Sequence, residues 1–182
     1  DMAIGAFGIV NRISFLFIMI IMGFNQGMQP IAGYNYGARQ LDRVVKILRY
    51  TIGCAVGVAT TGFLICQFFP RPMIYLFTTK KELIDIAARG LRIVLAFFPA
   101  VGFQMVTSSF FQSIGMAKKA IFLSLTRQLL FLIPCLLILP NIFGEIGVWI
   151  SIPVADVIAF ITALFMLIWQ LRYFRQLKTT KA

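Results

Sequence analysis

Two ionisable residues, Arg12 and Asp156, lie inside long apolar runs of the sequence. A charge at the centre of a membrane costs about 2.5–3.5 kcal/mol on insertion scales, so such residues pair, face water or serve a function. Counted from the outer ends of their runs at 1.5 Å per residue, the two lie at similar depths of roughly 12 and 13 Å. The sequence therefore predicts an Arg12–Asp156 charge pair. It is either a structural lock between two helices or part of a central cavity in which Asp156 carries a proton or cation.

Polar side chains inside other apolar runs are candidates for the lining of such a cavity. Gln104, Ser108 and Gln112 recur every four residues and so share one face of a helix. That face either lines the cavity or forms hydrogen bonds to a neighbouring helix. Arg127 lies about 12 Å inside its own run, where it either reaches an aqueous inner cavity or has a structural role. The candidate cavity-lining residues are Asn11, Gln104, Ser108, Gln112 and Arg127.

The sequence has little of what catalysis or metal binding needs. It contains no histidine, and its six acidic residues show no catalytic spacing. No HExxH, GxSxG or P-loop pattern occurs. Cys54, Cys66 and Cys135 lie in apolar runs without a CxxC pair, which is typical of small apolar filler. We therefore expect no enzyme activity, no metal site and no bound cofactor.

The elements that carry these residues are five long apolar runs. Hydrophobic residues make up 60% of the 182 positions, above the roughly 45–50% of ordinary soluble domains. Each run is near the length that crosses a bilayer as a helix, and is too long and uniform for a barrel strand. Helices also satisfy their own backbone hydrogen bonds in lipid. The sequence therefore predicts an all-α, polytopic helical membrane protein with spans at about residues 4–29, 50–69, 93–111, 120–139 and 147–171.

The distribution of lysine and arginine predicts the orientation of these spans. Eleven basic residues fall at one end of the runs, at 39–49, 118–127 and 172–181, and five fall at the other end, at 71–92. By the positive-inside rule the first end, and with it the C-terminus, is cytoplasmic. The net charge of +11 could also suit a nucleic-acid binder, but these cations flank apolar runs instead of covering a polar face. We therefore expect membrane lipid, and no nucleic acid, as a partner.

Four sequence motifs follow one another along the chain. They read QGMQPIAGYNYGA at 26–38, FFQSIG at 110–115, LSLTRQ at 123–128 and PVAD at 153–156. In type and order they closely resemble the motifs of multidrug and toxic compound extrusion (MATE) transporters. The resemblance implies a fold of two six-helix lobes, of which this chain, residues 1–182, would be part of the C-terminal lobe and supply spans eight to twelve. Its partner would be the missing N-terminal lobe of the same transporter.

The first motif also predicts the end of a helix on physical grounds. Its glycines allow backbone angles that other residues avoid, and its proline disfavours a helical conformation in the residue before it. Its tyrosines suit the membrane–water interface. We interpret the segment as an interfacial helix stop or as a gate on the cytoplasmic side. The residues concerned are Gln26, Gln29, Pro30, Gly33, Tyr34, Asn35, Tyr36 and Gly37.

The resemblance implies a function in transport. A MATE protein would be an antiporter of the plasma membrane that exports organic, often cationic, drugs and xenobiotics by alternating access. Some members carry an acidic cation-binding residue in the tenth span, but residues 93–111 contain none, so coupling to H⁺ or to Na⁺ stays open. The alternatives are a lipid-linked oligosaccharide flippase of the same wider superfamily and a non-transporting membrane scaffold. Flippases tend to have a strongly cationic cavity, whereas Arg12 and Arg127 are the basic residues clearly within these spans.

Overall fold

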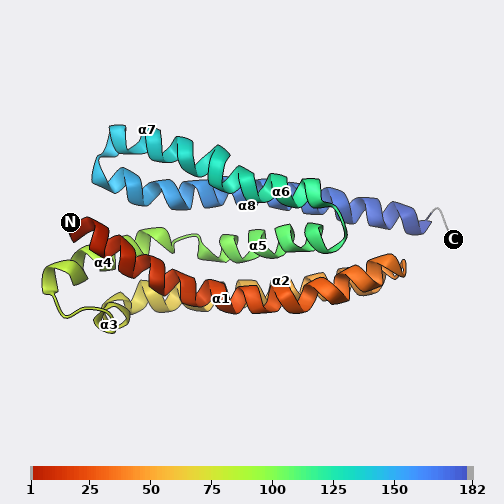
Figure 1. The fold of residues 1–182 in the computed structure, drawn as a ribbon, viewed down its shortest axis with the longest axis horizontal. Helices are drawn as coiled ribbons and strands as arrows, with labels where there is room; N and C mark the ends of the chain where they lie inside the picture. The colour runs from red at the N-terminus through yellow and green to blue at the C-terminus, as the bar shows by residue number, and fades with distance from the viewer. Residues whose placement is uncertain (1, 180–182) are drawn as a thin grey trace.

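The computed structural model describes residues 2–179, except for the side chains of Glu145, Lys178 and Thr179. In this range every regular element is a helix (Figure 1). The helices are α1 (Met2–Gly37), α2 (Leu41–Phe68), α3 (Pro70–Tyr75), α4 (Lys81–Val94), α5 (Phe98–Ser113), α6 (Ala117–Leu125), the π-helix η1 (Thr126–Leu132), α7 (Ile133–Phe143) and α8 (Glu145–Thr179). Lys181, one of the cations counted above, lies outside the described residues.

Within residues 2–179, four helical rods are long and apolar enough to cross a membrane. They are α1, α2, the continuous rod Ala117–Phe143 and the part of α8 from Ile146 to Leu177. α4 and α5 together qualify as a fifth, bent by 53° at the break between them. Pro99 explains this break, because it lacks the N–H that would continue helix α4. The predicted all-α membrane fold is confirmed, with five spans if the bent pair is one span.

Several helices are longer than the apolar runs that predicted them. α1 continues to residue 37, where an end near residue 29 was expected, and α2 begins at residue 41 instead of 50. The additional turns of α2 are rich in lysine and arginine, which favour helix but fall outside any hydropathy-based span. No apolar run predicts α3. Its Pro70 stands at the helix start, where a fixed φ and a missing N–H are favourable.

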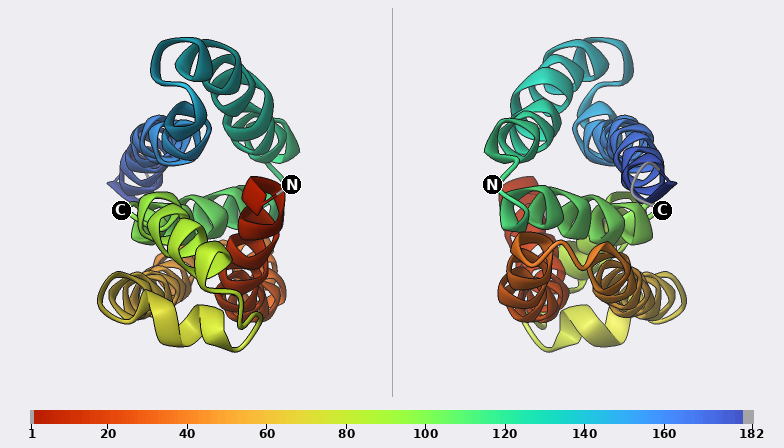
Figure 2. Two further views of the ribbon diagram at one scale, coloured as in Figure 1. Left: turned by 90° about the vertical axis from the view of Figure 1, so that its left-hand side faces the viewer. Right: turned by 90° about the vertical axis from the view of Figure 1, so that its right-hand side faces the viewer.

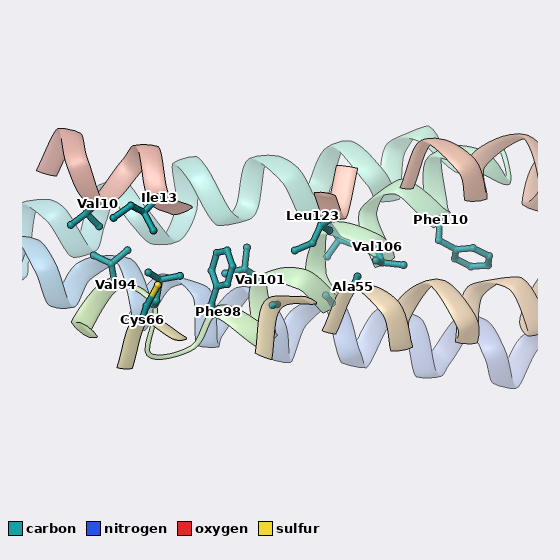
Figure 3. Packing of buried hydrophobic residues seen from close by; sticks show 14 of the residues in the cluster. Val10, Ile13, Ala55, Cys66, Val94, Phe98, Val101, Val106, Phe110 and Leu123 are labelled. Carbon is teal, nitrogen blue, oxygen red and sulfur yellow. The ribbon is translucent and has the colours of Figure 1, made fainter. Parts of the chain in front are cut away.

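Helix α5 lies in the middle of the bundle. It packs on α1 and α2 on one side and on α6 and α8 on the other, and end-on views show it between these two groups (Figure 2). Buried side chains of α1, α2, α3, α4, α5, α6 and α8 form one core, part of which Figure 3 shows. At Gly102 the approach to α2 is close, because a Cβ there would lie 3.0 Å from the carbonyl oxygen of Ala55. Small residues of this kind let helices in lipid gain van der Waals contact.

The turns group at two ends of the bundle. The α1–α2 turn, the α5–α6 turn and the C-terminal part of α8 lie at the right-hand end of Figure 1. α3, the α7–α8 turn and the start of α1 lie at the left-hand end. The right-hand end, which we call the basic end, carries Arg39, Lys118 and Arg172 with their basic neighbours. This grouping of segments agrees with the one that the lysine and arginine counts predict.

Candidate functional site

Asp156 of α8 and Arg127 of η1 form an ion pair in the apolar part of the bundle. Arg127 Nε donates a hydrogen bond to Asp156 Oδ1 over 2.9 Å. The Asp156 side chain is 4% exposed and that of Arg127 is 27% exposed. Since a buried carboxylate without a partner is costly, Arg127 is the cation that balances Asp156. The predicted Arg12–Asp156 pair is wrong, because the side chain of Arg12 is exposed and no described carboxylate lies within ion-pair distance of it.

The choice between the two arginines follows from which helices are neighbours. α8 packs on α7, η1 and α5, whereas α1 packs on α2, α4 and α5. The two helices touch elsewhere, since the rings of Phe7 and Trp149 lie 5.7 Å apart. Equal depth does not pair Arg12 with Asp156, because Arg12 lies on an exposed face of α1 while Asp156 is buried. Consecutive elements joined by a short turn are usually neighbours, and the fourth and fifth apolar runs are consecutive. This adjacency was the signal in the sequence that favoured Arg127 over Arg12.

Arg127 belongs to an irregular stretch of helix. η1 is π-helical, and such segments are frequent at functional sites. Pro134 gives a physical reason for it: an α-helix there would lose a hydrogen bond to the carbonyl of Leu130 and would clash with that carbonyl. A local change from α-helix to π-helix avoids both the lost hydrogen bond and the steric clash. The hydroxyl of Thr126, beside Arg127 in the chain, is buried with no hydrogen-bond partner among the residues described.

Of the described acidic side chains, Asp156 is the buried one. In the same part of the chain, no group of three or more cysteine, aspartate or glutamate side chains gathers to hold a metal ion. Among the described side chains, the carboxylate that a cation would meet inside the bundle is that of Asp156, which is already bonded to Arg127.

The predicted polar face of the third span forms contacts between helices. Gln104 Nε2 donates a hydrogen bond to the carbonyl oxygen of Leu123 over 3.3 Å, and the Ser108 hydroxyl donates to that of Ala120 over 3.2 Å. Both bonds run from α5 to α6. Of the two alternatives for this face, these contacts correspond to hydrogen bonding between helices. Gln112 is exposed near the end of α5 and remains a candidate for a cavity lining.

Helix α1 presents an exposed stripe that mixes polar with soft apolar side chains. The stripe consists of Asn11, Arg12, Phe15, Met19, Met22 and Gln26. Steps of three or four residues place them on one face of the helix. Its first residues border a shallow pocket of about 310 Å³. An arginine and two amides are unfavourable on a lipid-facing surface, so the stripe is suited to face water or another part of a protein.

The segment 26–38 stays helical nearly to its end, which corrects the predicted exit at its glycines. α1 continues through Pro30, since its packing on α2 and α5 outweighs the one hydrogen bond that the proline removes. The helix ends at Gly37, and Arg39, two residues beyond it, adopts a left-handed φ of 59°. The N–H of Arg39 donates to the Tyr36 carbonyl and the next N–H donates to that of Asn35, the two bonds of a Schellman cap.

The signature residues bring three helices together at the basic end. A Cβ on Gly33 of α1 would lie 3.0 Å from the carbonyl oxygen of Ser113, in the second motif. Gly115, with a φ of 77°, ends α5 with a cap of the same two-bond type. The rings of Tyr36 and Phe174 lie 5.9 Å apart, which links α1 to α8. These residues position α1, α5 and α8 relative to one another, and their role as a gate remains a prediction.

Sequence reasoning missed a polar contact between α6 and α8. Lys119 Nζ donates a hydrogen bond to Gln170 Oε1 over 2.7 Å and lies 4.5 Å from the centre of the Trp169 ring. Gln170 is 1% exposed. An amide near the end of a long apolar run was the available signal, because such a group needs a partner when it is buried. The contact holds the basic ends of the two helices together.

Comparisons with known proteins agree with this architecture. A family model described as MatE matches residues 1–137. The multidrug export protein MepA of Staphylococcus aureus (strain N315) is 26% identical over 173 residues, which are 91% of this chain and 36% of MepA. The solved structure of the MATE multidrug transporter DinF-BH is 40% identical with a TM-score of 0.82, and the match covers 92% of this chain and 37% of that one.

A further solved structure is the inward-facing conformation of a multidrug resistance MATE family transporter of the MOP superfamily. It is 26% identical with a TM-score of 0.84, over 97% of this chain and 41% of that one. The chain thus spans little more than a third of the length of the relatives it matches. The family model covers more than half of the chain, and the fold agrees with the solved structures. The chain is a multi-pass membrane protein and belongs to the MatE family of multidrug and toxic compound extrusion (MATE) transporters.

Proposed function

We propose that the protein takes part in ion-coupled export of organic, often cationic, drugs and xenobiotics. In this proposal the bundle alternates against an N-terminal lobe of the same transporter, and substrate binds between the two. The observation that carries the proposal is the exposed stripe on α1, which runs from Asn11 to Gln26. Its phenylalanine and methionine side chains adapt to apolar molecules of varied shape. Its polar residues suit a path that contains water.

Asp156 is the group to which we assign ion coupling. Its carboxylate is buried and bonded to Arg127, whose side chain is more exposed. A proton on the carboxylate, or a Na⁺ ion beside it, would weaken the attraction to the guanidinium. Arg127 would then be free to move toward water, and the π-helical segment that carries it would shift against α8. A single carboxylate suits H⁺ or Na⁺, and the experiment below separates the two.

We place the protein in the plasma membrane with the basic end in the cytoplasm, following the positive-inside rule. The C-terminal part of α8 then lies at the cytoplasmic side. Membrane lipid and the N-terminal lobe are its proposed partners, and the coupling ion is the one bound ion that transport requires. The proposal includes no catalytic step and no nucleic acid.

Drug export is favoured over transfer of a lipid-linked oligosaccharide. A cavity for pyrophosphate needs free cations, but Arg127 is already bonded to Asp156. Arg12 is the cation that remains on the exposed stripe. A non-transporting scaffold would have no need of a buried charge pair, whose desolvation is costly.

Efflux of a fluorescent organic cation from cells that express the whole gene tests the proposal. Collapse of one ion gradient, H⁺ or Na⁺, should stop efflux, and an imposed gradient of that ion should restore it after ATP depletion. Asp156→Asn should abolish efflux at normal abundance, whereas Glu82→Gln, at an exposed residue, should leave it intact. Efflux that survives the collapse of both gradients but stops on ATP depletion would contradict the proposal.

A further inference from the structure

Three arginines converge on one pocket at the end of the bundle opposite the basic end. The pocket has a volume of about 470 Å³ and lies where α2, α3 and α4 meet. Arg71 comes from α3, and Arg89 and Arg92 come from α4. Asp85 is the acidic side chain of the lining. The pocket therefore carries an excess of positive charge at the end that the positive-inside pattern expects to be poor in it.

The charges of the pocket are unequally balanced. Arg71 Nη2 donates a hydrogen bond to Asp85 Oδ1 over 3.0 Å. Arg89 and Arg92 are exposed and lie within ion-pair distance of no described carboxylate. Because they are three residues apart on α4, their guanidinium groups are neighbours on one helix face. Arg92 in the last turn also suits the helix dipole, but this does not account for the convergence of α3 and α4.

The position of α4 beside α2 is fixed by a specific contact. Gln67 Nε2, in the last turn of α2, donates a hydrogen bond to the carbonyl oxygen of Arg92 over 2.8 Å. Proline residues 70 and 72 form part of the pocket wall and stiffen the chain between the two helices. The arginines are thus held at the end of the apolar part of α2, where a membrane helix meets the headgroup region.

An exposed apolar surface leads from this pocket along α2. Phe68 and Phe69, in the pocket wall, are 72% and 63% exposed, and Leu64 one turn earlier is 45% exposed. A membrane phospholipid has the matching arrangement, with an anionic phosphate beside an acyl chain. Guanidinium groups donate forked hydrogen bonds to phosphate oxygens, so Arg89 and Arg92 suit the phosphate, and Leu64 and Phe68 suit the chain.

We propose that the pocket between α2, α3 and α4 binds the phosphate headgroup of an anionic phospholipid, held by Arg89 and Arg92, with an acyl chain along α2. A lipid bound there neutralises Arg89 and Arg92, which pair with no described carboxylate. It also explains why this end retains basic residues. A free phosphate ion has the same headgroup chemistry, but it would make no use of the apolar surface on α2.

Quenching of a single tryptophan in the pocket tests this site locally. The reporter is Phe68→Trp in the full-length protein in detergent micelles, with Trp149, Trp169 and every tryptophan of the N-terminal lobe replaced by Phe. Phosphatidylglycerol and phosphatidylcholine with brominated acyl chains are compared as quenchers. Phosphatidylglycerol should quench at lower mole fraction, and Arg89→Gln with Arg92→Gln should reduce this preference on the order of ten-fold. The control pair Lys80→Gln with Lys81→Gln removes the same charge at the same end, outside the pocket, and should retain the preference.

Three results would overturn the proposal. Equal quenching by the two lipids would show that the site does not distinguish charge. An equal loss in the two double variants would assign the effect to the general charge of this end. Relief of quenching by inorganic phosphate at constant ionic strength would identify a free-anion site instead of a lipid site. Quenching by phosphatidylcholine, unchanged in all variants, reports that the reporter residue keeps its contact with lipid.

Discussion

The carbonyl oxygen of Ser113 lies 3.0 Å from the place where a Cβ on Gly33 would stand. The two residues belong to different motifs and are eighty positions apart in the chain, and their contact joins α1 to the end of α5. Since the neighbouring atom is part of a capped helix end, it has little freedom to move aside. The glycine is therefore required for close approach and not for an unusual backbone angle.

The first prediction concerns this contact. Gly33→Ala should destabilise the protein by roughly 1–3 kcal/mol, because overpacking outweighs the gain of about 0.5–1 kcal/mol from replacing a helical glycine. The matched control is Gly23→Ala in the same helix, where a Cβ would meet nothing within 4 Å, and it should be neutral or stabilising. Thermal unfolding of the purified protein in detergent measures both. Equal unfolding temperatures for the two variants would show that the backbone near Ser113 moves aside for the added methyl group without a loss of stability.

The second prediction distinguishes the two arginines that lie in apolar runs. Arg127→Gln should destabilise the protein, by up to roughly 3 kcal/mol, because it leaves Asp156 buried without its partner. Arg12→Gln makes the same chemical change at an exposed residue and should alter stability by less than about 0.5 kcal/mol. Unfolding midpoints in one detergent provide the comparison. A larger loss of stability from Arg12→Gln than from Arg127→Gln would support the Arg12–Asp156 pair that equal depth predicts.

The third prediction concerns the charge pair as a unit. If Arg127 and Asp156 act mainly through their mutual attraction, the exchange of Arg127→Asp with Asp156→Arg should recover part of the abundance lost in either single variant. Transport need not recover, because the ion would meet its carboxylate on a different helix. Membrane abundance by immunoblot and efflux by fluorescence separate the two effects. No recovery of abundance in the exchange would indicate that the surroundings of each residue matter more than the pair.

The fourth prediction concerns Gln104, which bonds across to α6. Gln104→Leu should lower stability by about 0.6 kcal/mol and at most about 1.7 kcal/mol, the average and the maximum for hydrogen bonds between membrane helices. If Gln104 serves only to hold α5 and α6 together, the dependence of efflux on drug concentration should not change. Unfolding and efflux are measured on the same preparations, with Gln112→Leu, at an exposed position, as the comparison. An altered concentration dependence at unchanged stability would return Gln104 to the cavity lining.

The fifth prediction concerns the two ends of the bundle. In a background without Cys54, Cys66 and Cys135, cysteines at positions 118 and 172 should react with an impermeant thiol reagent from the cytoplasmic side. A cysteine at position 79 should react from the opposite side, because it lies between α3 and α4. Labelling of intact cells and of inverted vesicles makes the comparison. If positions 118 and 172 reacted from opposite sides, the conclusion that both lie at the same end of the bundle would be wrong.

The sequence by itself determined that the protein lies in a lipid bilayer and that its fold is all-α. Long apolar runs bounded by cations have one stable arrangement in a bilayer, as helices that satisfy their own backbone. This is a local property of each run, so it needed no knowledge of the neighbours. The four motifs likewise indicated the family, and the family model and related structures confirmed it.

The helix ends were harder to predict for a physical reason. Gly33, Gly37 and Pro30 indicated an early exit from α1, but packing on two neighbouring helices keeps the segment helical to Gly37. Local backbone preferences of about 1 kcal/mol are readily outweighed by such contacts. The π-helical form of η1 was equally hidden, although Pro134 marks the place where a regular α-helix is disfavoured.

Only the tertiary structure decided which residues meet. Depth along a helix can be counted from the sequence, and it placed Arg12 level with Asp156. Lateral position cannot be counted, because it depends on how the helices are arranged around α5. In that arrangement Asp156 pairs with Arg127, and Gln104 and Ser108 form hydrogen bonds to α6. It also places Gly33 in close contact with the carbonyl oxygen of Ser113. A buried charge needs a partner within hydrogen-bond reach, so the neighbouring helix, and not equal depth, determined the pair.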